Sequence, residues 1–106
     1  MNIVNLTPHD LNLYDENENL VLIVVASGKV ARVSVTRVKV GQICDVPIFK
    51  SEYGEVENLP APAPDTIYVV SGMVRAAVPD RTDVYQPGRL LRDENGRVVG
   101  AVGLTQ

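Results

Sequence analysis

Proline and turn residues interrupt this chain so often that only short segments can form regular structure. Prolines occupy positions 8, 47, 60, 62, 64, 79 and 87, and a proline removes a backbone donor and breaks a helix interior. The intervening runs, such as NIVNL, LNLY, LVLIVVA, TIYVV and RVVGAVGL, are rich in Val, Ile and Leu, as strands are. The sequence therefore predicts a mainly β protein, a small antiparallel β barrel or sandwich.

The chain has enough hydrophobic residues for one core, at 45% of 106 residues, so we expect a single domain over residues 1–106. The run GMVRAAV predicts one short helix near residues 72–78, with Ser71 as its N-cap. ARVSVTRVKV alternates between apolar and polar residues from Ala31 to Val40, which predicts a half-buried strand. No run approaches the ~20 apolar residues of a membrane-spanning helix, and no secretory pattern opens the chain, so we expect a cytoplasmic protein.

The net charge of −3 argues against a general nucleic-acid binder, which needs a basic face to displace counterions. One cysteine and one histidine cannot complete a zinc site of four ligands, and we expect no metal and no other cofactor. Cys44 lies between apolar neighbours in GQICDVP, which predicts a buried, unreactive thiol. A nucleophilic pair of Cys44 with His9 is the alternative.

Two segments share the same turn residues, LYDENENLV at 13–21 and LRDENGRVV at 91–99. Nothing outside these nine positions repeats, so we interpret them as two hairpin turns with the same chemistry rather than as a duplication. EVENLPAPAPD at 55–65 predicts an extended connector that packs over the surface of the domain.

The most polar segment follows the buried-strand pattern TIYVV and reads SGMVRAAVPDRTDVYQPG, residues 71–88. At a strand-to-helix junction, free backbone N–H groups near Ser71 and Gly72 can bind an anion. Arg75 and Arg81 could hold its charge bidentately, with Asp83 orienting an arginine. The alternative is structural: Ser71 only caps a short helix, Arg75 is solvated, and Arg81 forms a local salt bridge.

Further candidate ligand-binding residues carry rings and hydrogen-bonding groups. Tyr85 and Tyr53 offer rings for stacking, and Gln86 offers an amide that can bind a base edge. Thr7 and His9 lie in NLTPHD, a turn that we expect at the rim of the fold. No Gly-x-Ser-x-Gly motif or Ser-x-x-Lys motif is present, and we assign no catalytic residue.

Several motifs together resemble a group of small proteins carried by bacteriophages and mobile elements: NLTPHDLNLYDENENLV, SGKVARVSV, YGEVENLP, TIYVVS, VPDRTDVYQPG and RDENGRVVGAVGLT. The resemblance covers nearly the whole chain and brings no established activity with it. It implies a phage context and, by analogy, an anti-defence protein that acts in the cytoplasm of a bacterial host and sequesters nucleotide signals of an immune system. The chain departs from the group in its first hairpin, where ENE replaces a Gly-containing turn.

Three functions are compatible with these features. The expected one is a non-catalytic, homo-oligomeric sponge that binds a small anionic, nucleotide-like ligand in a pocket shared between subunits, with no membrane partner. The second is a small hydrolase of the same ligand that uses His9 with Glu55. The third is a structural or interaction protein of a phage particle or host complex. The predicted ligand-binding residues are Thr7, His9, Tyr53, Ser71, Gly72, Arg75, Arg81, Asp83 and Tyr85.

Overall fold

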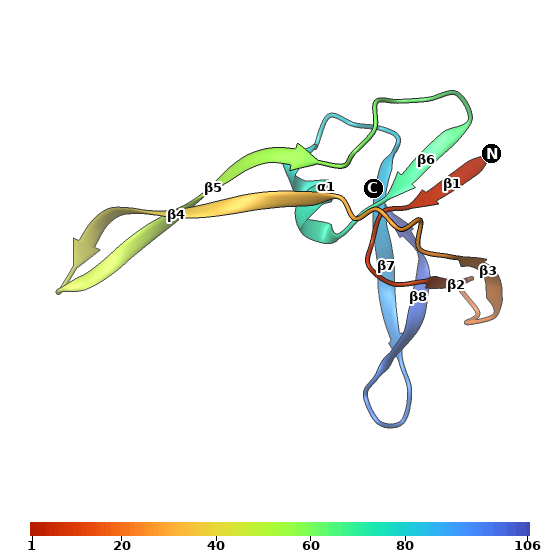
Figure 1. Ribbon diagram of the computed structural model, residues 1–106. Helices are drawn as coiled ribbons and strands as arrows, with labels where there is room; N and C mark the ends of the chain where they lie inside the picture. The colour runs from red at the N-terminus through yellow and green to blue at the C-terminus, as the bar shows by residue number, and fades with distance from the viewer.

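The computed structural model describes residues 1–106 and contains eight strands and one helix (Figure 1). In chain order these are β1 (Asn2–Asn5), β2 (Leu11–Tyr14), β3 (Leu20–Val24), β4 (Arg32–Ile43), β5 (Val46–Glu57), β6 (Thr66–Val69), α1 (Gly72–Ala77), β7 (Val84–Arg92) and β8 (Val98–Thr105). With 56% strand and 6% helix, the prediction of a mainly β fold with one short helix is confirmed. α1 has six residues, and no helix is long and apolar enough to cross a membrane.

Six strands form a sheet in the order β1-β6-β7-β8-β2-β3, which curls into a nearly closed barrel. The backbone N–H of Ser27 donates to the carbonyl of Asn5 at 3.0 Å, and a bridge between Asn5 and Ala26 brings the two ends of the sheet together. The pairs β2–β3 and β7–β8 are antiparallel, as adjacent hairpin strands must be. The pairs β1–β6, β6–β7 and β2–β8 join distant segments and are parallel.

The hydrophobic core lies between this sheet and α1. Its main cluster contains six buried residues, listed as Leu6, Ala31, Tyr68, Val70, Val74 and Val84. A smaller cluster of Leu13, Val24 and Ala101 lies under the β2–β3 end of the sheet. The TIYVV segment predicted as a buried strand supplies β6, of which Tyr68 and Val69 are buried.

β4 and β5 form a separate two-stranded sheet, residues 32–57, which extends away from the barrel and is called the arm below (Figure 1). Its pairing runs from Arg32–Glu57 at the base to Ile43–Val46 at the tip. The radius of gyration is 16.7 Å, whereas a compact chain of this length has about 13 Å. The arm accounts for the elongated shape, 51 × 39 × 22 Å.

Two predictions about the arm are wrong. The segment from Ala31 to Val40 is a strand, but only Ala31 is buried. β4 pairs with β5 alone, and α1 and the core cover only the base of the arm, where Val33 and Val56 are half-buried. Cys44 is exposed rather than buried. It forms the turn at the tip with Asp45, both residues having positive φ (48° and 64°), as a two-residue type I′ turn requires.

The two DEN turns have the chemistry that their sequence predicts. Asp15 Oδ1 accepts hydrogen bonds from the backbone N–H groups two and four residues later, at 2.9 and 3.0 Å. Asp93 Oδ1 accepts the equivalent pair at 2.9 and 3.0 Å. These local bonds close the β2–β3 and β7–β8 hairpins in the same way.

Candidate functional site

The largest hollow of the molecule opens on the barrel and has a volume of about 720 Å³. Its walls come from the β1–β2 loop, the start of β2, the Ser71–Gly72 junction, β7 and β8. The lining residues are Thr7, His9, Asp10, Leu11, Asn12, Ser71, Gly72, Gln86, Pro87, Gly88, Leu90, Val98, Val99, Gly100 and Ala101. An apolar floor with a few polar groups around it is the usual composition of a small-molecule site.

The turn on one side of the hollow is held by Asn5, a buried residue whose amide has all of its polar atoms bonded. Asn5 Nδ2 donates to the carbonyl oxygens of His9 (2.8 Å) and Val24 (3.0 Å). Asn5 Oδ1 accepts from the backbone N–H of Thr7 (2.9 Å) and from Thr7 Oγ1 (2.6 Å). Thr7 is therefore buried and positions the turn, whereas the exposed imidazole of His9 makes no hydrogen bond within the protein.

The opposite side of the hollow is the strand-to-helix junction. Ser71 is the N-cap of α1, as predicted, and its Oγ accepts from the backbone N–H of Val74 at 3.4 Å. Gly72 lies close to β7: a Cβ at this position would stand 2.7 Å from Gln86 Oε1. Glycine therefore leaves room for the Gln86 amide, which makes no hydrogen bond within the protein and lines the hollow.

β2 contributes the third polar wall through Asn12, and the preceding loop contributes Asp10. Asp10 Oδ1 accepts from the backbone N–H of Ala26 (2.8 Å), and Asn12 Nδ2 donates to the carbonyl of Val99 (3.1 Å). One oxygen of each side chain is left free of protein partners. Asp10 is the only Asp, Glu, Lys or Arg residue that lines the hollow, so the hollow carries negative rather than positive charge.

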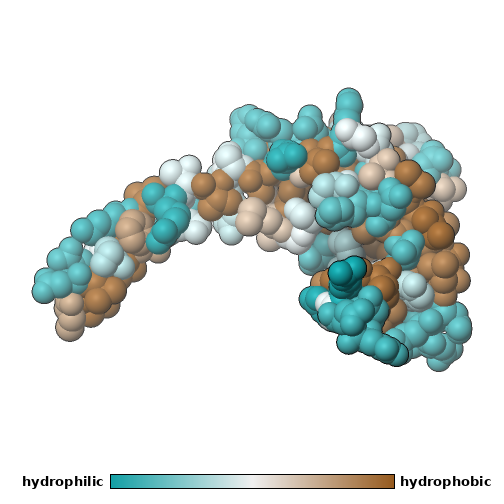
Figure 2. Space-filling model, turned by 60° about the horizontal axis from the view of Figure 1, so that its bottom comes forward, coloured by the Kyte–Doolittle hydropathy of each residue, from teal (hydrophilic) through white to brown (hydrophobic).

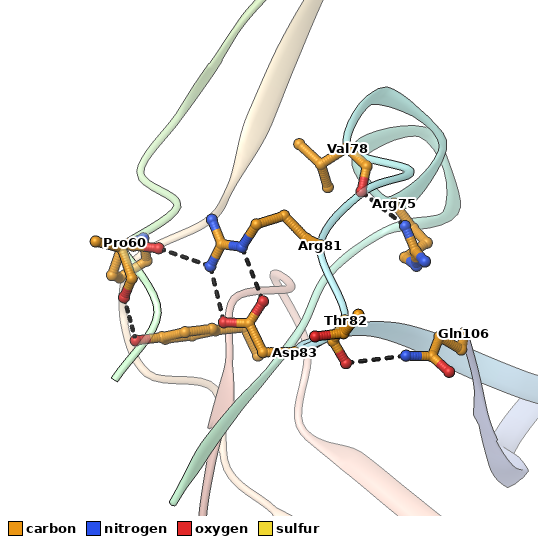
Figure 3. Close-up of polar contacts among 9 residues, drawn as sticks. Pro60, Arg75, Val78, Arg81, Thr82, Asp83 and Gln106 are labelled. Atoms are coloured by element: carbon orange, nitrogen blue, oxygen red, sulfur yellow. Dashed lines mark hydrogen bonds and ion pairs between the residues drawn. The ribbon is translucent and has the colours of Figure 1, made fainter. Parts of the chain in front are cut away.

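The two predicted arginines lie outside the hollow and bond to the protein itself (Figure 3). Arg81 makes a bidentate ion pair with Asp83 at 2.8 and 2.9 Å and also donates to the carbonyl of Pro60 at 3.0 Å. Arg75 Nη1 donates to the carbonyl of Val78 at 2.8 Å, at the C-terminal end of its own helix. Arg81 thus forms the local salt bridge given above as the alternative, whereas Arg75 bonds to a backbone carbonyl instead of being solvated.

The Arg81–Asp83 pair also ties the proline-rich connector to the barrel. Arg81 reaches the connector at Pro60, and Tyr68 Oη donates to the carbonyl of Ala61 at 3.2 Å. The hydrogen bond from Arg81 lowers the pKa of Asp83 and outweighs the opposing effect of burial, and the positive charge of Arg81 adds a smaller lowering. The same bond raises the pKa of Arg81.

The two predicted aromatic residues do not reach the hollow. Tyr85 precedes Gln86 on β7, and since successive strand residues point to opposite faces, its side chain lies on the other face of the sheet from the Gln86 amide. Tyr53 belongs to the arm, where it is 57% exposed. The structure therefore brings together Thr7, His9, Ser71 and Gly72, and leaves the other five predicted residues elsewhere.

Asn12 and the β8 floor were missed by the sequence reasoning. Asn12 lies between Leu11 and Leu13 in an alternating strand, where a polar residue is ordinary. Its place beside the hollow depends on the parallel pairing of β2 with β8, which joins residues far apart in the chain. No local signal could have shown it.

Comparison of the chain with protein-family models, with curated proteins and with solved structures gives no match.

Proposed function

We propose that this protein is a non-catalytic binding protein that holds a small polar ligand in the hollow between β2, β7 and β8. The observation that carries the proposal is a hollow of about 720 Å³, within the usual range for small-molecule sites, into which the unpaired amide of Gln86 and the imidazole of His9 are presented above an apolar floor.

The charge of the lining residues supports a ligand whose bound part is neutral or positively charged. Asp10 lines the hollow, whereas no Lys or Arg does. A nucleoside has suitable chemistry, because the amides of Asn12 and Gln86 can each donate to and accept from a base edge, and Leu11, Leu90 and Val99 can contact an apolar ring face. If the ligand is a nucleotide, as the sequence resemblance suggests, its phosphate would lie at the open side, outside this lining.

The anti-defence role is a sharper form of the same proposal and depends on the sequence resemblance alone. A phage protein that binds an immune signal without cleaving it would need a binding site and no catalytic group. Glu55, the suggested partner of His9 in a hydrolase, belongs to the arm and does not line the hollow.

The proposal is tested by incubating the protein with nucleosides, nucleotides and cyclic dinucleotides, removing unbound material, denaturing the protein and identifying what is released by mass spectrometry. Intact ligand supports binding without catalysis, and a cleaved product supports the hydrolase. Absence of any released ligand favours the second candidate below.

Substitution of Gln86, whose amide is unpaired, then tests whether the ligand binds in the hollow. Gln86→Leu keeps the side-chain volume and removes the hydrogen bonds, so it should weaken ligand binding by about threefold to tenfold. Gln42→Leu, on the exposed arm, is the matched control and should leave affinity unchanged. Arg81→Ala decides between the hollow and the arginine site suggested by the sequence: unchanged affinity supports the hollow, and a loss of about tenfold or more supports the arginine site.

A structural or interaction role is the second candidate, and the arm favours it. Eight of its large apolar side chains are exposed: Val35, Val38, Val40, Ile43, Val46, Ile48, Phe49 and Tyr53. Apolar surface gathered on one projecting element marks an interaction site more often than scattered apolar residues do.

A further inference from the structure

The arm is an incomplete sheet. Each of its two strands pairs only with the other, so both outer edges have unpaired backbone groups, and edges of this kind readily pair with another strand. A two-stranded hairpin is marginally stable in water, and three or more strands with a hydrophobic face are needed for independent stability. Figure 2 shows hydrophobic residues at the surface along the arm and near its tip.

The surface area of the molecule is large enough to include an interface. The accessible surface is 7330 Å², whereas a compact monomer of this length exposes about 5,800 Å². The excess, about 1,500 Å², exceeds the ~800 Å² that each partner contributes to a standard stable interface.

We propose that the arm is a self-association element: β5 of one copy pairs antiparallel with β5 of a second copy about a two-fold axis at Ser51. The two arms then form one four-stranded sheet in the order β4-β5-β5-β4. This inference does not depend on the ligand proposed for the hollow.

The charges select β5 rather than β4 as the paired edge. β4 carries Arg32, Arg37 and Lys39 and no acidic residue, so two antiparallel β4 strands would bring positive charges together. β5 carries charges of both signs: Lys50 and Glu52 are two residues apart and therefore on the same face, and Glu55 and Glu57 lie nearer the base of the arm. Within one copy they lie opposite Val38 and Thr36, and the only ion pair of the molecule is Arg81–Asp83. Lys50 and Glu52 are thus free for a partner.

The register of the β5–β5 pairing is restricted because only part of the outer edge of β5 is regular. Pro47 has no N–H to donate, and beyond Tyr53 the pairing of the arm shifts by a residue before it resumes at Val56. A second shift lies between Ile48 and Phe49, where the partners on β4 step from Gly41 to Lys39. The regular part of β5 is therefore residues 49–53. A two-fold axis between antiparallel copies of one strand passes through a single residue of that strand, so only a few positions are possible.

Charge eliminates the neighbouring axis positions. An axis at residue 50 places Lys50 opposite its own copy, and an axis at residue 52 does the same with Glu52, both destabilising like-charge pairs. An axis at Ser51 places each Lys50 opposite Glu52 of the second copy, which makes two attractive cross-strand pairs.

The other face of the paired strands is also complementary in this register. Phe49 lies opposite Tyr53 of the second copy, so the sheet gains two aromatic cross-strand pairs, which favour strand pairing. Phe49 is already oriented within its own arm, because the guanidinium carbon of Arg37 lies 4.3 Å from the centre of its ring. Phe49 is 44% exposed and Tyr53 is 57% exposed in the single copy, and pairing would cover part of both.

Disulfide formation tests the axis. In Cys44→Ser/Ser51→Cys, the two introduced thiols face each other with Cα atoms about 4.5–5.5 Å apart, within disulfide range, and oxidised glutathione should convert the protein largely to a covalent dimer. The unsubstituted protein is the control, since its single Cys44 is exposed at the tip. In the proposed dimer the two Cys44 residues lie about 46 Å apart, at about 3.3 Å per strand residue, and should not form a cross-link.

Charge reversal tests the register without a cysteine. Lys50→Glu converts both attractive pairs into repulsive ones and should raise the dimer dissociation constant by about tenfold or more, as measured by sedimentation equilibrium. Lys50→Glu/Glu52→Lys restores opposite charges at both positions and should restore the dimer. A protein that is monomeric at all concentrations overturns the proposal. So does a dimer that is indifferent to Lys50→Glu and does not cross-link at residue 51, because association then uses another surface such as β3.

Discussion

The barrel and the arm are built from the same residue types and differ in almost everything that holds them together. All twelve buried residues belong to the barrel or its connections, and none belongs to β4 or β5. Val84 in the barrel is fully buried, whereas Val40 in the arm is 60% exposed. The difference shows that a strand pattern of Val and Ile indicates strand formation, while burial depends on whether a second layer covers the strand.

The largest difference between the two regions is expected for removal of an apolar side chain. Leu6 is 2% exposed in the main core cluster, and Leu6→Ala should lower the free energy of unfolding by about 2–5 kcal/mol. Ile43 is 64% exposed at the tip of the arm, and Ile43→Ala should change the free energy of unfolding by less than about 0.5 kcal/mol. Urea denaturation monitored by circular dichroism measures both. Similar losses in the two variants would mean that the arm is covered in solution.

Gly→Ala substitutions, which add a methyl group, should also affect the barrel more than the arm. A Cβ at Gly100 would meet the ring of Tyr14 and the carbonyl oxygen of Asn12, and the backbone oxygen cannot move aside easily. Gly100→Ala should therefore destabilise the protein by about 1–3 kcal/mol. Gly41, in the arm, has no atom within 4 Å of such a Cβ, and Gly41→Ala should be neutral within about 0.5 kcal/mol. Thermal melts of the two variants suffice, and a destabilised Gly41→Ala would show that the arm packs against something.

The smallest expected effect on stability comes from the Arg81–Asp83 ion pair, which belongs to the barrel. Because the pKa of Asp83 is lowered in the folded protein, ion pairing with Arg81 stabilises the fold fully above the ordinary carboxyl pKa of about 4. That contribution is lost as the pH falls through the lowered pKa of Asp83. Asp83→Asn should reduce stability near neutral pH by about 1 kcal/mol or less and should weaken the loss of stability in acid.

Urea midpoints measured between neutral and acidic pH give this dependence. Asp45→Asn is the control in the arm, because Asp45 lies at the exposed tip and makes no ion pair. Equal changes in the acid dependence of the two variants would contradict a specific role for the Arg81–Asp83 pair.

Much of the local structure could be predicted because its causes are local. The Asp15 and Asp93 turns form through bonds from a carboxylate to N–H groups within four residues, and Ser71 caps α1 through Val74, three residues away. Short-range chemistry of this kind is readable from sequence. The mainly β class, the single helix and the strand positions followed from the same signals.

The tertiary structure alone decided burial, pairing direction and membership of the hollow. β1 pairs in parallel with β6 across some sixty residues of chain, and this pairing sets the Thr7–His9 turn near Ser71. Arg75 and Arg81 were expected to face a ligand, but protein carbonyls and Asp83 lie closer and bind their guanidinium groups. Cys44 has apolar neighbours in the sequence, yet they lie at the exposed tip of the arm, away from α1 and the core. The composition of a segment determines what it can form, whereas solvent exposure is determined by chain segments that are distant in sequence.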